Sequence, residues 1–190
     1  MSTQRGDTII EVMLAFAVFA MIAVGALTVM NRGVASAQDA LETTLVRAQM
    51  DNQVEMLRFL NRAYSDNPDS SMGKKYHDIL AKTTDADASE FAAAGCIDAI
   101  PGAGPFFVES DGVVSTSVIP MSNASAPAFA QVVTSPTTSS YGLWIEAVKG
   151  EATNGAPGFV DFHVRACWEG LTSSVPRTLG TIVRLYDPAT

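Results

Sequence analysis

The stretch Gly6-Asp7-Thr8-Ile9-Ile10-Glu11-Val12-Met13-Leu14 opens an almost unbroken apolar run that continues to Met30. From Val12 to Met30 no side chain is charged, and Thr28 carries the only polar one. The run is rich in residues that favour helices, and at 1.5 Å per residue it would span roughly 28 Å, close to the hydrocarbon thickness of a bilayer. The sequence therefore predicts a helix that can cross a membrane.

The residues just before this run form a more specific pattern. Arg5-Gly6 precedes Asp7, and Glu11 stands directly before the uncharged residues. This pattern resembles the processing signal of type IV pilins and pseudopilins, in which a short polar leader ends in Gly and the fifth mature residue is Glu. An ordinary secretory signal is instead cut beyond its apolar run. The resemblance implies a leader from Met1 to Gly6, which prepilin peptidase would remove by cutting between Gly6 and Asp7.

The resemblance also implies that Glu11 acts in subunit assembly. Cleavage would leave a free amine on Asp7, and in the family the acid of one subunit meets the terminal amine of a neighbour as the helices stack. An unpaired carboxylate in apolar surroundings costs on the order of 2–3 kcal/mol or more, so this pairing would set the axial register. The alternative is that Glu11 only marks the membrane border, where the helix dipole favours an acid.

Two departures from the family pattern affect these expectations. Many pilins begin with an N-methylated Phe, whereas the first mature residue here would be Asp7, so methylation of Asp7 is left open. Major pilins often carry Pro midway along the apolar run, whereas this run has only Gly25 as a weak point. A Pro-induced kink is therefore not expected.

The partners that the resemblance implies are self and other pilin subunits in a helical filament, prepilin peptidase, an inner-membrane assembly platform and, before assembly, membrane lipid. The implied location is a single-pass membrane protein with an extracytoplasmic C-terminal head, followed by an extracellular filament on a prokaryotic cell. The sequence leaves open a major or minor pilus subunit, in adhesion or motility, and a pseudopilin of a type II secretion or DNA-uptake machine.

The composition argues against several other classes of protein. The chain has 12 basic and 20 acidic residues, a formal net charge of −8, and no basic patch of the kind that phosphate binding requires. Nucleic acid is therefore not expected on the bulk surface. Sequence motifs for a nucleophile elbow, a phosphate loop, a zinc protease or a dinucleotide site are missing, and the only histidines are His77 and His163. We expect no enzyme, no cofactor and no metal site.

The two cysteines, Cys96 and Cys167, would both lie in the exported head. In an oxidising compartment they are expected to form a disulfide, which would stabilise the fold by roughly 4 kcal/mol in the chain-entropy model. Two buried free thiols are the alternative. A zinc site with His163 is disfavoured, because four residues along a strand separate His163 from Cys167 by about 13 Å.

The polar part of the chain continues the helical pattern and then changes to strands. We expect one helix from Thr8 to Tyr64, its second half amphipathic, and a stop in the turn-forming cluster Ser65–Ser71. The expected apolar stripe consists of Val34, Ala37, Leu41, Leu45, Ala48, Met56, Phe59, Leu60 and Ala63. Short helices are expected at 74–82 and 87–94. The expected strands, which alternate in polarity, are Phe106–Glu109, Val113–Ile119, Tyr141–Lys149, Phe159–Glu169 and Thr178–Tyr186.

This order predicts an α+β fold, with a long N-terminal helix packed on a C-terminal antiparallel sheet. The predicted regions are a leader at 1–6, a helix at 7–64 whose part 8–30 is membrane-spanning or filament core, a connector at 65–105 and a sheet head at 106–190. The pilin resemblance implies the same lollipop architecture. Two less favoured hypotheses are a soluble binding domain released by cleavage after Ala37, within Ala35-Ser36-Ala37, and a membrane-anchored enzyme.

Overall fold

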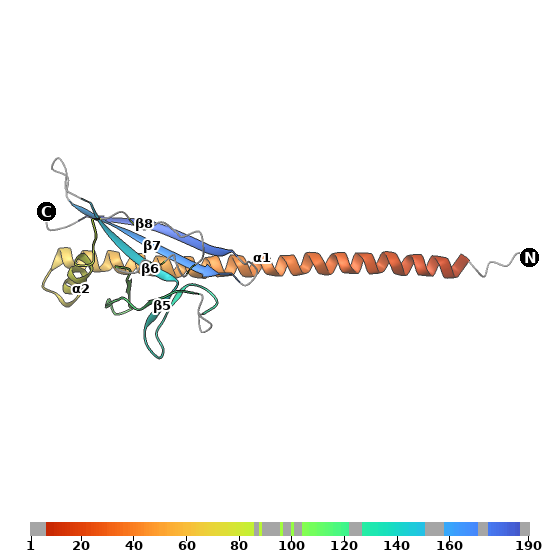
Figure 1. Ribbon diagram of the computed structural model, residues 1–190, viewed down its shortest axis with the longest axis horizontal. Coiled ribbons are helices and arrows are strands. Elements are labelled where there is room, and N and C mark those ends of the chain that lie inside the picture. Colours follow the sequence, from red (N-terminus) through yellow and green to blue (C-terminus); the bar gives the residue numbers. More distant parts are fainter. Residues whose placement is uncertain are drawn as a thin grey trace, which may run out of the picture. The chain divides into compact units, whose positions relative to one another are not determined.

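The computed structural model describes residues 7–85, 88, 96, 100, 104–121, 127–150, 158–170 and 175–186 (Figure 1). Within them the fold class is α+β, as predicted. The chain divides into two compact units, Met1–Leu41 and Glu42–Thr190, and each is described by itself. The elements are α1 (Asp7–Asp66), α2 (Ser71–Leu80), β1 (Phe107–Val108), β2 (Val114–Ser115), β3 (Val118–Ile119), β4 (Gln131–Val133), β5 (Ser139–Tyr141), β6 (Leu143–Gly150), β7 (Phe159–Glu169) and β8 (Pro176–Tyr186).

All described residues of the first unit belong to α1, which has 60 residues in total. Gly25 and Gly33 do not interrupt it, and this confirms the expectation of a helix without a break. Thr28 donates its hydroxyl to the carbonyl oxygen of Val24 at 2.9 Å. The one polar side chain of the apolar run is thus satisfied within its own helix, as a low-dielectric environment requires.

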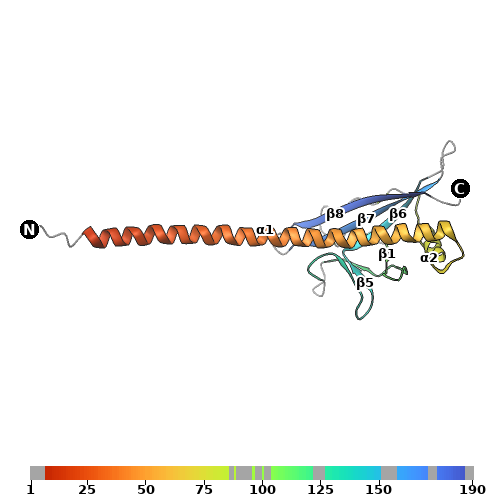
Figure 2. The same ribbon diagram turned by 180° about the vertical axis from the view of Figure 1, so that it is seen from behind.

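In the second unit, one face of α1 is buried against the strands. Val46, Met50, Val54, Leu57 and Leu60 are each at most 6% exposed, and their spacing of three or four residues places them along one side of the helix. The strands β6, β7 and β8 lie along this part of α1, and β5 lies on a different side of it (Figure 1 and Figure 2). The helix therefore supplies a central part of the hydrophobic core.

The predicted stripe on α1 was only partly correct. Leu60 is buried, but Leu41, Leu45 and Phe59 are 59%, 37% and 53% exposed, and Val34, Ala37 and Ala48 are exposed as well. The helix carries two apolar stripes, and the one that packs also contains the buried polar residues Glu42 and Gln53. Because these polar residues interrupt the apolar pattern, hydrophobic periodicity did not identify the packed face.

The largest sheet consists of β6, β7 and β8 in that order, with antiparallel pairing throughout. Strand β7 has the predicted bounds, and Val160, Phe162, Val164, Ala166 and Trp168 on one of its faces are all buried, as predicted. Their register partners in β6 include Leu143 and Ile145, which are fully buried too. One face of this sheet therefore forms the core with α1.

The predicted strand from Tyr141 to Lys149 is divided at Gly142 into β5 and β6. Gly142 has a φ of 62°, and a Cβ at this position would lie 2.2 Å from the carbonyl oxygen of Cys167. Only glycine fits such a close approach of two backbones in this conformation. The bend sends β5 into a second sheet, of order β3-β5-β4, and leaves β6 in the first.

The small strands differ from the prediction in three respects. The expected strand Val113–Ile119 consists of two short strands, β2 and β3, because its two ends pair with different strands. Strand β2 pairs with β1, and β3 pairs with β5. Strand β4 was not predicted. The pairing of β3 with β5 is parallel, whereas the other pairings between the named strands are antiparallel.

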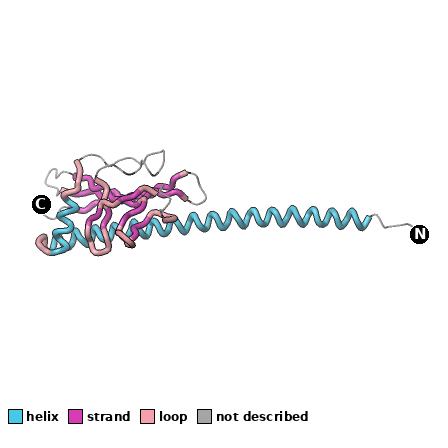
Figure 3. The backbone as a smooth tube through the Cα atoms, turned by 60° about the horizontal axis from the view of Figure 1, so that its bottom comes forward, coloured by secondary structure: helices cyan, strands magenta, loops and turns pink. Residues whose placement is uncertain are grey.

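Helix α1 ends at Asp66, inside the turn cluster predicted to stop it, and α2 follows (Figure 3). Ser70 caps α2 by accepting a hydrogen bond from the Gly73 amide at 3.0 Å. The apolar face predicted for this short helix is confirmed, since Tyr76 and Ile79 are buried, and the Tyr76 ring lies 5.5 Å from that of Tyr64. The helix expected at 87–94 lies outside the described residues, apart from Ala88.

Candidate functional site

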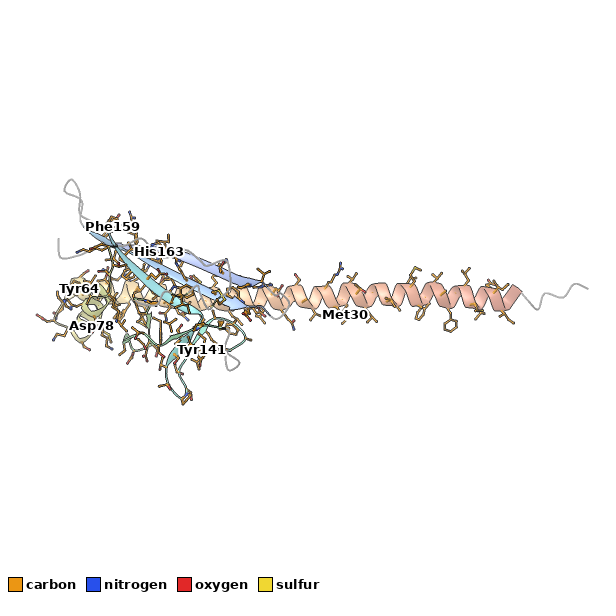
Figure 4. All side chains as sticks on the ribbon, viewed as in Figure 1. Met30, Tyr64, Asp78, Tyr141, Phe159 and His163 are labelled. Carbon is orange, nitrogen blue, oxygen red and sulfur yellow. A yellow bond between two sulfur atoms is a disulfide. The ribbon has the colours of Figure 1, made fainter. Side chains whose placement is uncertain are left out.

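The apolar run of the first unit has no partner among the described residues. From Ile9 to Met30 the large apolar side chains are 51% to 78% exposed, and Figure 4 shows Met30 projecting from the helix. This helix is long and apolar enough to cross a membrane, by length and composition. Burying each such side chain is worth about 1.5–3 kcal/mol, so this surface strongly favours an apolar environment.

The residues predicted for processing and assembly lie at the start of this helix. Gly6 lies outside the described residues, and Asp7 is the first residue of α1. Glu11 is exposed one helical turn beyond Asp7, and it makes no hydrogen bond or ion pair within the described part of the chain. The backbone therefore places the position of the expected amine and the Glu11 carboxylate on the same side of the helix, with an axial rise of about 6 Å between them.

The predicted disulfide between Cys96 and Cys167 is present in the structure. The two Cα atoms are 5.4 Å apart, and the bridge spans 71 residues of sequence. Both cysteines are 1% exposed. The bond ties the connector to the face of β7 that points away from the α1 core, and it excludes Cys167 as a thiolate ligand for a metal.

That second face of the sheet holds a buried polar cluster that sequence reasoning did not find. Glu146 of β6 accepts a hydrogen bond from the indole nitrogen of Trp144 at 2.9 Å, and its Oε1 lies 3.4 Å from Nε of Arg165 on β7. The side chains of Arg165 and Glu146 are each 10% exposed. The alternation of polar and apolar residues in β7 predicted that Arg165 lies on the mixed face. Its neighbours Trp144 and Glu146 follow only from the register between β6 and β7. Trp144 and Trp168 are both buried, as predicted.

Further along the same face, Asp161 and Arg184 form a two-pronged ion pair with N–O distances of 2.8 and 2.7 Å. Hydrogen bonding from Arg184 lowers the pKa of Asp161, and the same pair raises the pKa of Arg184. The guanidinium also lies 3.8 Å from the centre of the Phe159 ring. These contacts link the side chains of β7 and β8 at one end of the sheet.

His163 lies between these two ion pairs on β7 (Figure 4). It was expected to be solvent-exposed, but it is half-buried, because Glu146 is its partner across the strands and Arg165 is close by. Burial lowers the pKa of His163, and the neighbouring Arg165 lowers it further. The side chain is therefore neutral at neutral pH.

Two buried polar side chains of α1 were also missed. Gln53, 6% exposed, exchanges two hydrogen bonds with the backbone of Val108, at 2.9 and 2.8 Å. Glu42, also 6% exposed, accepts a hydrogen bond from the indole of Trp168 at 3.3 Å, and its other oxygen has no hydrogen-bond partner among the described residues. A polar residue within a helical apolar stripe was the only available signal for either.

In the described part of the chain, no cluster of three His, Cys, Asp or Glu residues could hold a metal ion. His77 is on α2 and His163 is on β7. The arrangement that stands out in the described part of the chain is the exposed apolar helix with its single acid, Glu11.

Comparison of the chain with protein-family models, with curated proteins and with the solved structures gives no match in any of the three.

Proposed function

We propose that this chain is a structural subunit of a type IV pilus-like filament, anchored in the membrane and then polymerised through α1. The observation that carries the proposal is the row of large apolar side chains from Ile9 to Met30, all at least 51% exposed, with Glu11 as the only charge within it. Such a helix needs lipid around it, or other helices of the same kind.

The position of Glu11 supports assembly rather than anchoring alone. An anchor needs no acid in its second turn, and a carboxylate moved into apolar surroundings requires a partner. Cleavage after Gly6 would create a cation on Asp7, on the same side of the helix as Glu11. Two helices offset by about one turn, roughly 6 Å, could then pair the amine of one with the acid of the other. The same chemistry would serve a surface pilus or a pseudopilus.

The first experiment measures the intact mass and N-terminal sequence of the protein recovered from its native membrane or from sheared surface material. An N-terminus at Asp7, with or without one methyl group, supports the proposal. An N-terminus at Met1 identifies a plain anchor and contradicts it. Recovery from sheared surface filaments, rather than from the envelope alone, would favour a pilus over a pseudopilus.

A second experiment tests the role of Glu11. Glu11→Ala and Glu11→Val should insert into the membrane normally but enter filaments at least about tenfold less, because the neighbouring amine is left unpaired. Thr28→Val is the matched control, since it removes a polar group from the same run without touching the pair. Normal incorporation of both Glu11 variants would remove the pairing argument.

One observation favours a second candidate, a soluble domain released by cleavage after Ala37. The second compact unit begins at Glu42, so a chain starting at Gln38 would retain all of it. Recovery of the protein from the medium with Gln38 as its first residue would establish this alternative and make the apolar helix a signal segment.

A further inference from the structure

The charged residues of α1 at the two ends of the apolar run have opposite signs. Asp7 and Glu11 are acidic and lie at its start, and Arg32 is the first charged residue after it. At 1.5 Å per residue, Glu11 and Arg32 are about 32 Å apart along the axis of the helix. The hydrocarbon part of a bilayer is about 30 Å thick, so each of these two charges would lie near one surface of the membrane.

The charges of Glu11 and Arg32 are not balanced by contacts within the protein. Both side chains are exposed, and neither makes a hydrogen bond or an ion pair within the described part of the chain. The nearest charge to Arg32 further along the helix is Asp39, about two turns away. The two ends of the run therefore respond to an electric field as separate charges of opposite sign.

Processing determines the net charge of the starting end. In the proposed function, on which this inference rests, cleavage between Gly6 and Asp7 removes Arg5 and leaves a free amine on Asp7. At neutral pH the amine is a cation, and the carboxylates of Asp7 and Glu11 are anions. One cation and two anions leave one net negative charge. Without the Asp7 carboxylate, the amine would balance Glu11 and this end would be neutral.

Entry into a filament outside the cell carries the starting end of the helix across the membrane. The inside of a living cell is electrically negative, so the potential favours outward movement of a negative charge. For one charge, a potential of 100 mV changes the equilibrium by about 40-fold. Arg32 starts at the outer surface and does not cross the field, so the potential acts on the starting end alone.

We propose that Asp7 gives the mature helix the net negative charge through which the membrane potential promotes its transfer from the membrane into the filament. Glu11 is balanced by the amine, and Asp7 supplies the surplus. An acid in the first turn of a helix is also favoured by the helix dipole. That contribution does not depend on the membrane potential, so the dependence on potential distinguishes the proposed role from a purely structural one.

The test compares the wild type with Asp7→Asn, with both full chains produced together in cells that assemble the filament. Valinomycin and external potassium set the membrane potential. Mass spectrometry of the N-terminal peptides gives the ratio of wild type to variant in sheared filaments and in the membrane. The filament ratio divided by the membrane ratio should rise with the potential, by about 40-fold per 100 mV. Because both chains share one assembly machine, other effects of the potential cancel.

Two matched controls identify the charge and its location. Asp7→Glu keeps the charge and should compete equally with the wild type at every potential. Arg32→Gln removes one charge at the other end of the run, and its ratio to the wild type should not change with the potential. A ratio for Arg32→Gln that changed as much as that for Asp7→Asn would overturn the proposal, because the effect would not belong to the end that crosses the membrane.

A second variant leaves Asp7 unchanged, because Asp7 is next to the bond that is cleaved. Thr8→Lys adds a positive charge to the starting end and makes it neutral, so its competition with the wild type should depend on the potential as that of Asp7→Asn does. Thr8→Gln is its uncharged control and should keep a constant ratio to the wild type. N-terminal sequencing of each variant confirms that cleavage still occurs before residue 7.

The outcomes separate this inference from the proposed function. Filaments whose subunits begin at residue 7, with ratios for Asp7→Asn and Thr8→Lys that do not change with the potential, would overturn the inference and leave the proposed function intact. The Asp7 carboxylate would then cross the membrane as the neutral acid. A wild type that keeps residues 1–6, or that does not enter filaments, would overturn the proposed function and this inference with it.

Discussion

Helix α1 contributes to both units, and its apolar residues have opposite environments in the two. In the first unit Leu27 is 60% exposed and Val24 is 64% exposed. In the second unit Leu57 is fully buried and Met50 is 2% exposed. The residue types are alike, but in the second unit strands of the same chain cover the helix, whereas in the first unit the described residues supply no cover.

This difference shows that hydrophobicity alone does not identify the partner of a helix. The second unit has a complete core of its own, with a buried disulfide and two buried tryptophans. Its stability therefore depends on contacts that the chain makes with itself. In the first unit, cover for the apolar side chains has to come from outside the described residues, and under our proposal lipid or other helices supply it. Substitutions in the two parts should accordingly affect different measurements.

The largest effect is expected from the disulfide. Replacing Cys96 and Cys167 together by Ser should lower the free energy of unfolding of the second unit by about 4 kcal/mol, since the closed loop is long. Urea unfolding followed by tryptophan fluorescence measures this, because Trp144 and Trp168 both lie in the second unit. The fraction of protein in the membrane pellet should not change. Equal unfolding midpoints for variant and wild type would show that the bridge adds no stability.

A matched pair of leucines sharpens the comparison directly. Leu57→Ala should destabilise the second unit by about 2–5 kcal/mol, because it leaves a cavity in a packed core. Leu27→Ala, on the same helix, should change that unfolding free energy by less than about 0.5 kcal/mol. It should instead lower the retention of the protein in membranes after a carbonate wash. If both substitutions lowered the unfolding free energy equally, Leu27 would be packed in the protein as Leu57 is, and the comparison would fail.

The sequence predicted much of the fold, because the clearest sequence patterns reflect interactions between residues that are close along the chain. The long helix, its stop after Tyr64, strand β7 and its buried face followed from periodicity and turn formers. The face of α1 that packs did not, because Gln53 and Glu42 interrupt its apolar pattern, and their partners Val108 and Trp168 are far away in sequence. The division at Gly142 had the same cause, since its φ of 62° and the close approach of Cys167, which is far away in sequence, are what require glycine there.

A smaller effect is expected at Gln53. Gln53→Ala would leave the buried N–H and C=O of Val108 without partners and should cost about 1–3 kcal/mol in the free energy of unfolding. Gln49→Ala, one turn earlier and without a hydrogen bond to lose, should change it by less than about 0.5 kcal/mol. Chemical denaturation of both variants measures the difference. Equal effects would mean that the amide of Gln53 does not replace a strand partner for β1.

The smallest effect is a dependence of the second unit's stability on pH. The folded state lowers the pKa of His163 below its ordinary 6.5, through burial and the nearby Arg165. The unfolded chain therefore binds a proton at higher pH than the folded chain does, and the stability present above about pH 6.5 is lost as the pH falls through the folded pKa. The lowered pKa of Asp161 acts in the same direction, but only below its ordinary 3.8.

Thermal unfolding midpoints measured between pH 7.5 and pH 5 should therefore decrease for the wild type, and should decrease less for His163→Asn, which cannot titrate. Asp161→Asn serves as the control over this range, because the Asp161 carboxylate stays ionised throughout it. Its midpoint should be lower at every pH, since it loses the pair with Arg184, and its slope should be at least as steep as that of the wild type, because the Asp161 charge raises the pKa of His163 in the folded state. An unchanged slope in His163→Asn would assign the acid sensitivity to another group. These groups all lie in the second unit, so the same pH change should leave the membrane retention of the protein unaltered. A change of pH should then affect the stability of the second unit without affecting the apolar part of α1.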